Sequence, residues 1–157
     1  MYGEVLAVVI IVASIVLAGV IVVAVFFFKN LQDLLKECDP ANQQLPPANV
    51  WLMFIPLFNI VYRFIMYPKV SETLKREFES RGAPQQGDYL KGLGLALSIA
   101  NAVNILLPQS IRGLIGLGCI AVMIVYWTKA AEMKNKLRSL PKGDGGVRFS
   151  DNPDLLD

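Results

Sequence analysis

The side chains that could do chemistry in this chain are few, and the most notable ones stand in apolar segments. Asn59 and Arg63 are four residues apart, and Asn101 and Asn104 are about one helical turn apart. An ionisable group within a membrane-embedded segment is by default a functional hypothesis, here a polar path for a solute. The simpler interpretation is that Arg63 extends toward the interface beside Lys69, while the asparagines hydrogen-bond between packed helices.

Other chemistry has little to build on. The chain has no histidine and two cysteines, so it lacks the commonest general base and cannot build a four-ligand zinc or iron–sulfur site. No phosphate-binding loop, dinucleotide fingerprint, nucleophile elbow or paired-acid site occurs, and no sequence signal pairs Cys38 with Cys119. We therefore expect no enzyme activity, no cofactor, no metal site and no nucleic-acid partner.

The composition indicates which elements must hold these residues. Of the 157 residues, 54% are hydrophobic and 18% are charged, against about 25% charged in ordinary globular proteins. The apolar residues fall into four segments, which cover residues 5–28, 50–67, 93–107 and 111–127. We expect an all-α integral membrane protein with three to four membrane segments, formed by one helical domain over residues 1–140. Residues 141–157 are expected to be a flexible cytoplasmic tail.

The first segment, Val5–Phe28, has 24 uncharged residues. As a helix it is about 36 Å long, which exceeds the ~30 Å hydrocarbon core of a bilayer. No Lys or Arg precedes it and no small-residue cleavage site follows it, so we interpret it as an uncleaved anchor. Residues 30–38 are expected to extend the same helix. Pro108, Gln109 and Ser110 separate the third and fourth segments, which predicts a helical hairpin.

The second segment, residues 50–67, allows two interpretations. Pro56 interrupts it, so it is either one proline-kinked span or a re-entrant pair of half-length helices. Short loops rich in Lys and Arg stay in the cytoplasm. A re-entrant segment leaves 13 of these residues inside and only Arg112 outside, against 11 and three for a span, with Arg63 uncounted. The charges favour the re-entrant form with the N-terminus outside, and both forms have a cytoplasmic C-terminus. Because Cys38 changes sides between them, labelling it would distinguish the two.

Amphipathic helices are expected on the cytoplasmic side. Residues 69–81 place Val70, Leu74 and Phe78 on one apolar face. The ion pairs with i,i+4 spacing in this helix are Glu72–Arg76, Lys75–Glu79 and Glu77–Arg81. A partner subunit, the lipid surface or a helix expected over residues 130–140 could cover the apolar face.

Small residues give the third and fourth segments faces on which another helix can pack closely. Together with the apolar face of residues 69–81, they make up the predicted packing or partner-binding set. Its members are Gly92, Ala96, Ala100, Asn101, Asn104, Gly113, Gly116, Gly118, Val70, Leu74 and Phe78.

The region from Asp39 to Phe78 resembles a group of small uncharacterised bacterial multi-pass membrane proteins. The matching positions are Pro47, Val50, Trp51, Leu52, Ile55, Pro56, Leu57, Phe58, Asn59, Ser71, Leu74, Glu77 and Phe78. Ala48 stands where that group usually has glycine. The resemblance covers about a quarter of the chain. It implies a bacterial inner membrane and a domain of unknown function, with no activity to carry over.

Two functions from different classes are therefore expected. The first is a non-catalytic accessory or scaffold subunit of a bacterial inner-membrane complex, which acts by helix packing. Its partners would be the lipid bilayer and other integral membrane subunits, or a second copy of the chain. The alternative is a homo-oligomeric channel or transporter component whose polar path includes Asn59, Arg63, Asn101 and Asn104.

Overall fold

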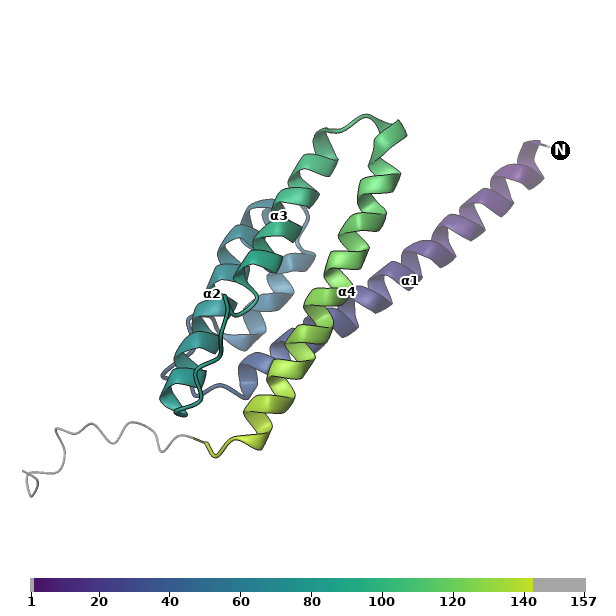
Figure 1. The fold of residues 1–157 in the computed structure, drawn as a ribbon. Coiled ribbons are helices and arrows are strands. Elements are labelled where there is room, and N and C mark those ends of the chain that lie inside the picture. The colour runs from purple at the N-terminus through teal and green to yellow at the C-terminus, as the bar shows by residue number, and fades with distance from the viewer. Residues whose placement is uncertain (1, 143–157) are drawn as a thin grey trace, which may run out of the picture.

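The computed structural model describes residues 2–142 of the 157-residue chain, so the predicted tail lies almost wholly outside the described residues. Within that range the structure is helical and has no strand, which confirms the all-α class. The elements are α1 (Tyr2–Lys36), the 3₁₀ helix η1 (Pro47–Phe54), α2 (Phe58–Ser80), α3 (Lys91–Leu106) and α4 (Gln109–Ser139). Figure 1 shows them as an elongated bundle from which α1 diverges toward the N-terminus.

Two helices in the described range, α1 and α4, are long and apolar enough to cross a membrane, as judged by length and composition. None of the apolar stretch of α1 is buried within the chain, and only 11% of that of α4 is. The core helix of a water-soluble protein would instead be mostly buried. α1 continues without a break to Lys36, so residues 30–36 of the expected extension are part of the same helix, and residues 37 and 38 lie beyond its end.

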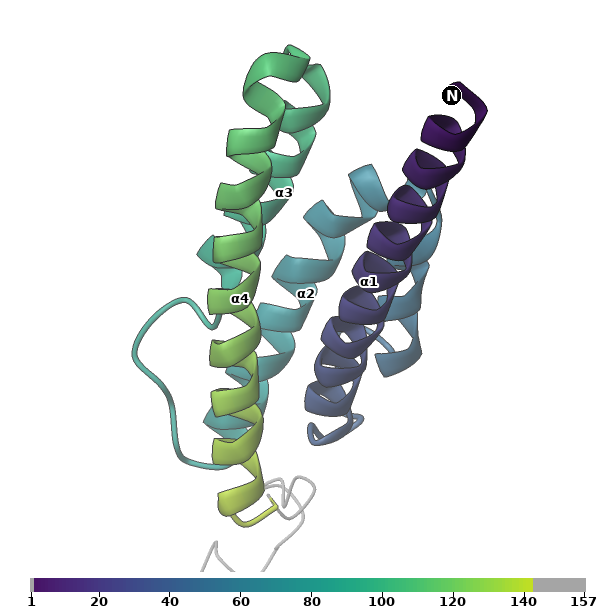
Figure 2. The same cartoon turned by 90° about the vertical axis from the view of Figure 1, so that its right-hand side faces the viewer.

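The hairpin expected from Pro108 is present as α3 and α4, which lie side by side in both views (Figures 1 and 2). Leu107 is extended, as the residue before a proline should be, and α3 ends there. Arg112 donates from Nη2 to the carbonyl oxygens of Ile105 and Leu107, at 3.3 and 2.8 Å. These bonds satisfy acceptors that the end of a helix leaves without partners.

The second apolar segment reverses direction instead of forming one kinked helix. Figure 2 shows η1 and α2 as a hairpin whose turn lies toward the same end as the N-terminus. The turn centres on Leu57, with φ 63° and ψ −50°, and the N–H of Phe58 binds the carbonyl of Pro56 at 2.6 Å. This is a γ-turn, a strained conformation for leucine. The N–H groups of Ile55 and Asn59 also bind backbone carbonyls, so the reversal meets much of its own hydrogen-bonding need.

α2 differs from the expected boundary at Pro68, because the helix passes through this proline and continues to Ser80. An interior proline costs about 3 kcal/mol. The helix persists because residues on both sides of the proline, such as Tyr67 and Val70, are buried in the core. The end of α2 lies where expected. Gly82 has φ 67°, and its N–H binds the carbonyl of Glu79 in a glycine-terminated cap.

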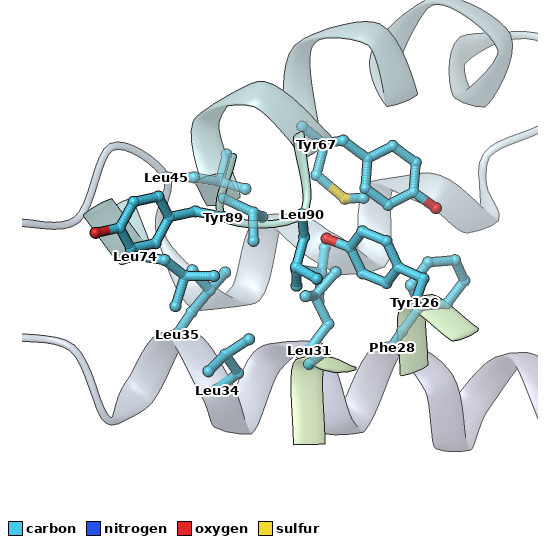
Figure 3. Packing of buried hydrophobic residues seen from close by; sticks show 14 of the residues in the cluster. Phe28, Leu31, Leu34, Leu35, Leu45, Tyr67, Leu74, Tyr89, Leu90 and Tyr126 are labelled. Carbon is cyan, nitrogen blue, oxygen red and sulfur yellow. The ribbon is translucent and has the colours of Figure 1, made fainter. Parts of the chain in front are cut away.

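The core lies at the end of the bundle where α1, α2 and α4 terminate (Figure 3). Val70, Leu74 and Phe78 belong to it and are fully buried. Their cover comes from the chain itself, including Leu34 of α1 and Leu137 of α4, rather than from a partner or lipid. The predicted apolar face of residues 69–81 is therefore not available for partner binding.

Cys38 lies in this core and cannot serve as the topology reporter that the sequence suggests. It is 3% exposed, its thiol donates to the carbonyl of Leu34 at 3.6 Å, and burial, with a smaller contribution from Glu77, raises its pKa to about 12. The thiolate fraction at neutral pH is thereby lowered on the order of a thousandfold relative to a free cysteine. In the Cys119→Ala variant we expect maleimide to label Cys38 only after denaturation, as measured by intact mass. Rapid labelling of the folded protein would contradict this burial.

Candidate functional site

The polar residues of the apolar segments come together where α3 packs along α2. Arg63 from α2 and Asn101 and Asn104 from α3 line two neighbouring cavities of about 260 and 240 Å³. Asn59 lines the smaller cavity only. The four residues that the sequence singled out as a possible polar path therefore do share one region of the fold. We call Arg63, Asn101 and Asn104 the polar wall.

The side chain of Arg63 points away from the basic end of its helix. Its Nη2 donates to Oδ1 of Asn59 at 2.5 Å and its Nε donates to the backbone carbonyl of Asn59 at 3.3 Å. Asn59 lies one turn closer to the N-terminus of α2, whereas Lys69 lies further toward its C-terminus. The expectation that Arg63 extends toward Lys69 is therefore wrong. Its guanidinium lies inside the bundle because Asn59 offers two acceptors there.

Within the described part of the chain, the two asparagines of α3 do not form the expected hydrogen bonds between helices. Asn101 donates from Nδ2 to the carbonyl of Leu97 in its own helix at 2.9 Å. Oδ1 of Asn104 is buried and has no partner among the described residues. Gly116 of α4 lies beside this amide, since a Cβ at that position would be in ordinary contact with Nδ2 of Asn104, at 4.0 Å.

Around the polar wall, the larger cavity is mainly apolar and receives residues from five elements. Its apolar lining includes Phe27, Phe28, Met53, Leu97, Ile120 and Met123. None of the ion pairs formed within residues 2–142 includes Arg63. The guanidinium is therefore a half-buried cation whose hydrogen-bond partner is a neutral amide.

The other predicted small residues of α3 are not buried. Gly92 and Ala96 are exposed and Ala100 is half-buried, whereas the small residues that α3 does bury are Gly94 and Ser98, which are not in the predicted set. On α4, Gly113 and Gly118 are exposed, and a Cβ at either position would meet nothing within 4 Å.

A second polar cluster joins the ends of the helices. Oε1 of Glu77 and Nη2 of Arg81 are 2.6 Å apart, and both side chains are at most 3% exposed. Arg81 donates from Nη1 to the carbonyl of Leu137 and from Nη2 to that of Glu37, each at 2.7 Å. Oε2 of Glu77 accepts the backbone N–H of Asp39 at 2.8 Å. We call Glu77 and Arg81 the end-clamp, because they hold the last turns of α1 and α4 against α2.

Sequence reasoning identified this pair as one of three i,i+4 ion pairs but did not distinguish it as buried. The signal that it is buried was present in the spacing: Glu77 and Arg81 follow Val70 by seven and eleven residues, which places them on the same helical face as Leu74. The end-clamp is fully used in holding backbone groups, so it has the properties of a structural cluster.

No family model, curated protein or solved structure matches this chain. Among the described residues, no group of three or more His, Cys, Asp or Glu side chains could hold a metal ion. The resemblance over Asp39 to Phe78 stays a prediction.

Proposed function

We propose that this chain is an integral protein of the bacterial inner membrane that acts as a non-catalytic accessory or scaffold subunit of a larger complex. The observation that carries the proposal is the free surface of α1, where every residue from Tyr2 to Val23 is exposed. These 22 residues, about 33 Å of helix, are almost all apolar. An exposed apolar surface of this extent requires lipid or another protein as cover.

A three-span arrangement with a re-entrant η1–α2 hairpin accounts for the distribution of residues. The tip of the hairpin exposes apolar side chains, with Ile55 at 49% and Leu57 at 81%, which suits a turn that ends within lipid. The hydrogen bonds at its reversal supply what backbone at that depth needs. α1, α2 and α4 end together at the opposite end, near Lys75 and Arg138, and this end would be cytoplasmic.

The outward glycines of α4 favour a protein contact over lipid alone. Lipid chains are satisfied by any apolar side chain, and glycine lowers helix stability by about 1 kcal/mol relative to alanine. Gly113 and Gly118 face open space within the chain, so nothing in the described structure requires their small size. Close approach of a helix from another subunit would make use of it.

The test is recovery of a stoichiometric partner after gentle detergent extraction and cross-linking, identified by mass spectrometry. Gly118→Leu should reduce recovery at least about fivefold, because a steric clash of about 1 kcal/mol changes affinity by that factor. The control is Leu117→Ile, at the exposed residue next to Gly118, which adds no volume and should leave recovery of the partner unchanged. Isolation of the wild-type chain as a lone monomer, or equal recovery with both variants, would refute the subunit role.

The proposed orientation is tested with cysteines at exposed positions in place of the buried Cys38. Ala41 lies between α1 and η1 and Gly3 lies near the start of α1, and both are exposed. In a background that lacks Cys38 and Cys119, we expect an impermeant maleimide to label Gly3→Cys in intact spheroplasts and Ala41→Cys only after lysis. The reverse pattern, or labelling of both before lysis, would contradict the re-entrant hairpin.

A homo-oligomeric channel or transporter component is the second candidate, and the meeting of Asn59 with the polar wall favours it. A pore requires these groups to face water, whereas a closed cavity requires only that they be accessible to a ligand. If the chain conducts, liposomes that contain it should show solute or ion flux that Arg63→Ala abolishes. Liposomes that contain folded oligomer without flux would count against this candidate.

A further inference from the structure

We propose that the larger cavity binds an anionic amphiphile, with its carboxylate or phosphate head at the polar wall and its hydrocarbon tail along the apolar lining. The cavity combines three polar residues on one side with an apolar wall on the other (Phe27, Met53 and Met123 among them). A site of about 260 Å³ lies just below the ~300–1,000 Å³ typical of ligand pockets, which suits a head group and the first part of one chain.

Charge selects an anion. A guanidinium has five N–H donors, and Arg63 directs two of them to Asn59, which leaves three without an acceptor among the described residues. Placing a cation in apolar surroundings without a counter-charge is costly. A carboxylate or phosphate oxygen would supply both the missing charge and the missing acceptors, in the paired geometry that guanidinium favours.

Asn104 supplies a second, independent indication of an occupant. Its Oδ1 is buried and lacks a donor among residues 2–142, and a buried acceptor without a donor is rare in folded proteins. A hydroxyl of the ligand, or a water molecule carried with its head group, would satisfy this oxygen.

The tail has a continuous apolar path out of the cavity. Ala24 and Phe27 of α1 and Ile120 of α4 form part of the cavity lining. From Val23 toward the N-terminus, α1 is exposed and diverges from the bundle (Figure 1). A hydrocarbon chain that leaves the cavity along α1 therefore stays in contact with apolar side chains. This path does not depend on a partner subunit, so the ligand site and the subunit role can fail separately.

Cys119 lines the cavity and provides the readout. The protein is reconstituted in phosphatidylcholine vesicles, and the rate at which N-ethylmaleimide modifies Cys119 is followed by peptide mass spectrometry. Three probes share one tail and differ in the head: dodecanoate, dodecyl phosphate and dodecanol. We expect one or both anions to slow modification at concentrations at which dodecanol has no effect, and the anion that acts identifies the head group.

The matched variants are Arg63→Gln and Arg112→Gln, which remove the same charge at the cavity and at the α3–α4 turn. Arg63→Gln should raise the anion concentration needed for protection at least about tenfold, because it removes charge-assisted hydrogen bonds. In Arg112→Gln, the anion should protect Cys119 at the same concentration as in the wild type. Arg63→Lys keeps the positive charge, so the anion should still protect Cys119 in part. Partial protection in this variant would show that the loss in Arg63→Gln comes from weaker anion binding and not from misfolding.

Four outcomes would overturn the proposal. Equal protection by dodecanol would show that the cavity selects only for apolar tails. Protection that is unchanged in Arg63→Gln, or absent with both anions in the wild type, would remove the head-group site. Rapid modification of Cys119 by a hydrophilic, membrane-impermeant thiol reagent would indicate a water-filled path and would favour the channel instead.

Discussion

Replacing Glu77 with alanine is expected to lower the free energy of unfolding by about 3 to 5 kcal/mol, because it leaves the guanidinium of Arg81 buried without its counter-charge. The carboxylate also accepts the N–H of Asp39 and the side-chain amide of Asn42, each at 2.8 Å. Those donors would lose their acceptor as well. The loss should appear as a cooperative shift, since the end-clamp joins α1, α2 and α4.

The measurement is an SDS titration of the protein in dodecyl maltoside micelles, followed by tryptophan fluorescence. Glu79→Ala is the matched control on the same helix. Its carboxylate is 50% exposed and lies 4.0 Å from Nζ of Lys75, so its removal should cost less than about 1 kcal/mol. If the two variants lost the same stability, the Glu77–Arg81 pair would not be buried as the structure has it.

Gly94→Ala is expected to destabilise the protein by about 1 to 3 kcal/mol through overpacking. A Cβ at position 94 would lie 2.5 Å from Cβ of Tyr67 and 2.6 Å from its Cγ, which is closer than side-chain atoms can approach. Tyr67 cannot easily move away, because it is 5% exposed and its ring packs edge-on against Tyr126 at 5.1 Å. Relief therefore requires α2 and α3 to separate.

The control is Gly118→Ala, where a Cβ would meet nothing within 4 Å. Alanine stabilises a helix relative to glycine, so this variant should gain about 0.5 to 1 kcal/mol in the same titration. The two glycine substitutions are thus expected to have effects of opposite sign. A neutral Gly94→Ala would mean that α3 does not lie as close to α2 as the structure indicates.

The end-clamp and the polar wall are two clusters of polar groups with different properties. In the end-clamp, Glu77 and Arg81 pair with each other, the carboxylate accepts the N–H of Asp39, and the guanidinium donates to backbone carbonyls. These contacts hold three helix ends together. The polar wall leaves N–H donors of Arg63 and an acceptor of Asn104 without partners among residues 2–142. The hydrogen-bonding groups of the end-clamp are satisfied within the chain, whereas those of the polar wall can still bind a ligand. This contrast is why the cavity and not the end-clamp is the candidate site.

The positions of the helices follow from local signals in the sequence. Long apolar runs and prolines act on their immediate neighbours, so the helical hairpin at Pro108 and the interruption at Pro56 could be predicted without knowledge of the rest of the chain. The end of α2 at Gly82 is local for the same reason, because only the φ of that residue and its nearest carbonyls are involved. The sequence suggested that four polar residues share one path, and the packing of α3 along α2 does bring them together. They are Asn59, Arg63, Asn101 and Asn104.

What the tertiary structure decided depends on contacts between residues far apart in the chain. The amphipathic pattern shows that Val70 and Leu74 need cover, but it does not contain the information that α1 and α4 provide it. Arg81 is buried because Glu37 and Leu137, 44 and 56 residues away, present carbonyls to it. Periodicity identifies a face of a helix, and the free energy of a buried charge depends on which groups meet that face. Those groups are known only once the helices have packed.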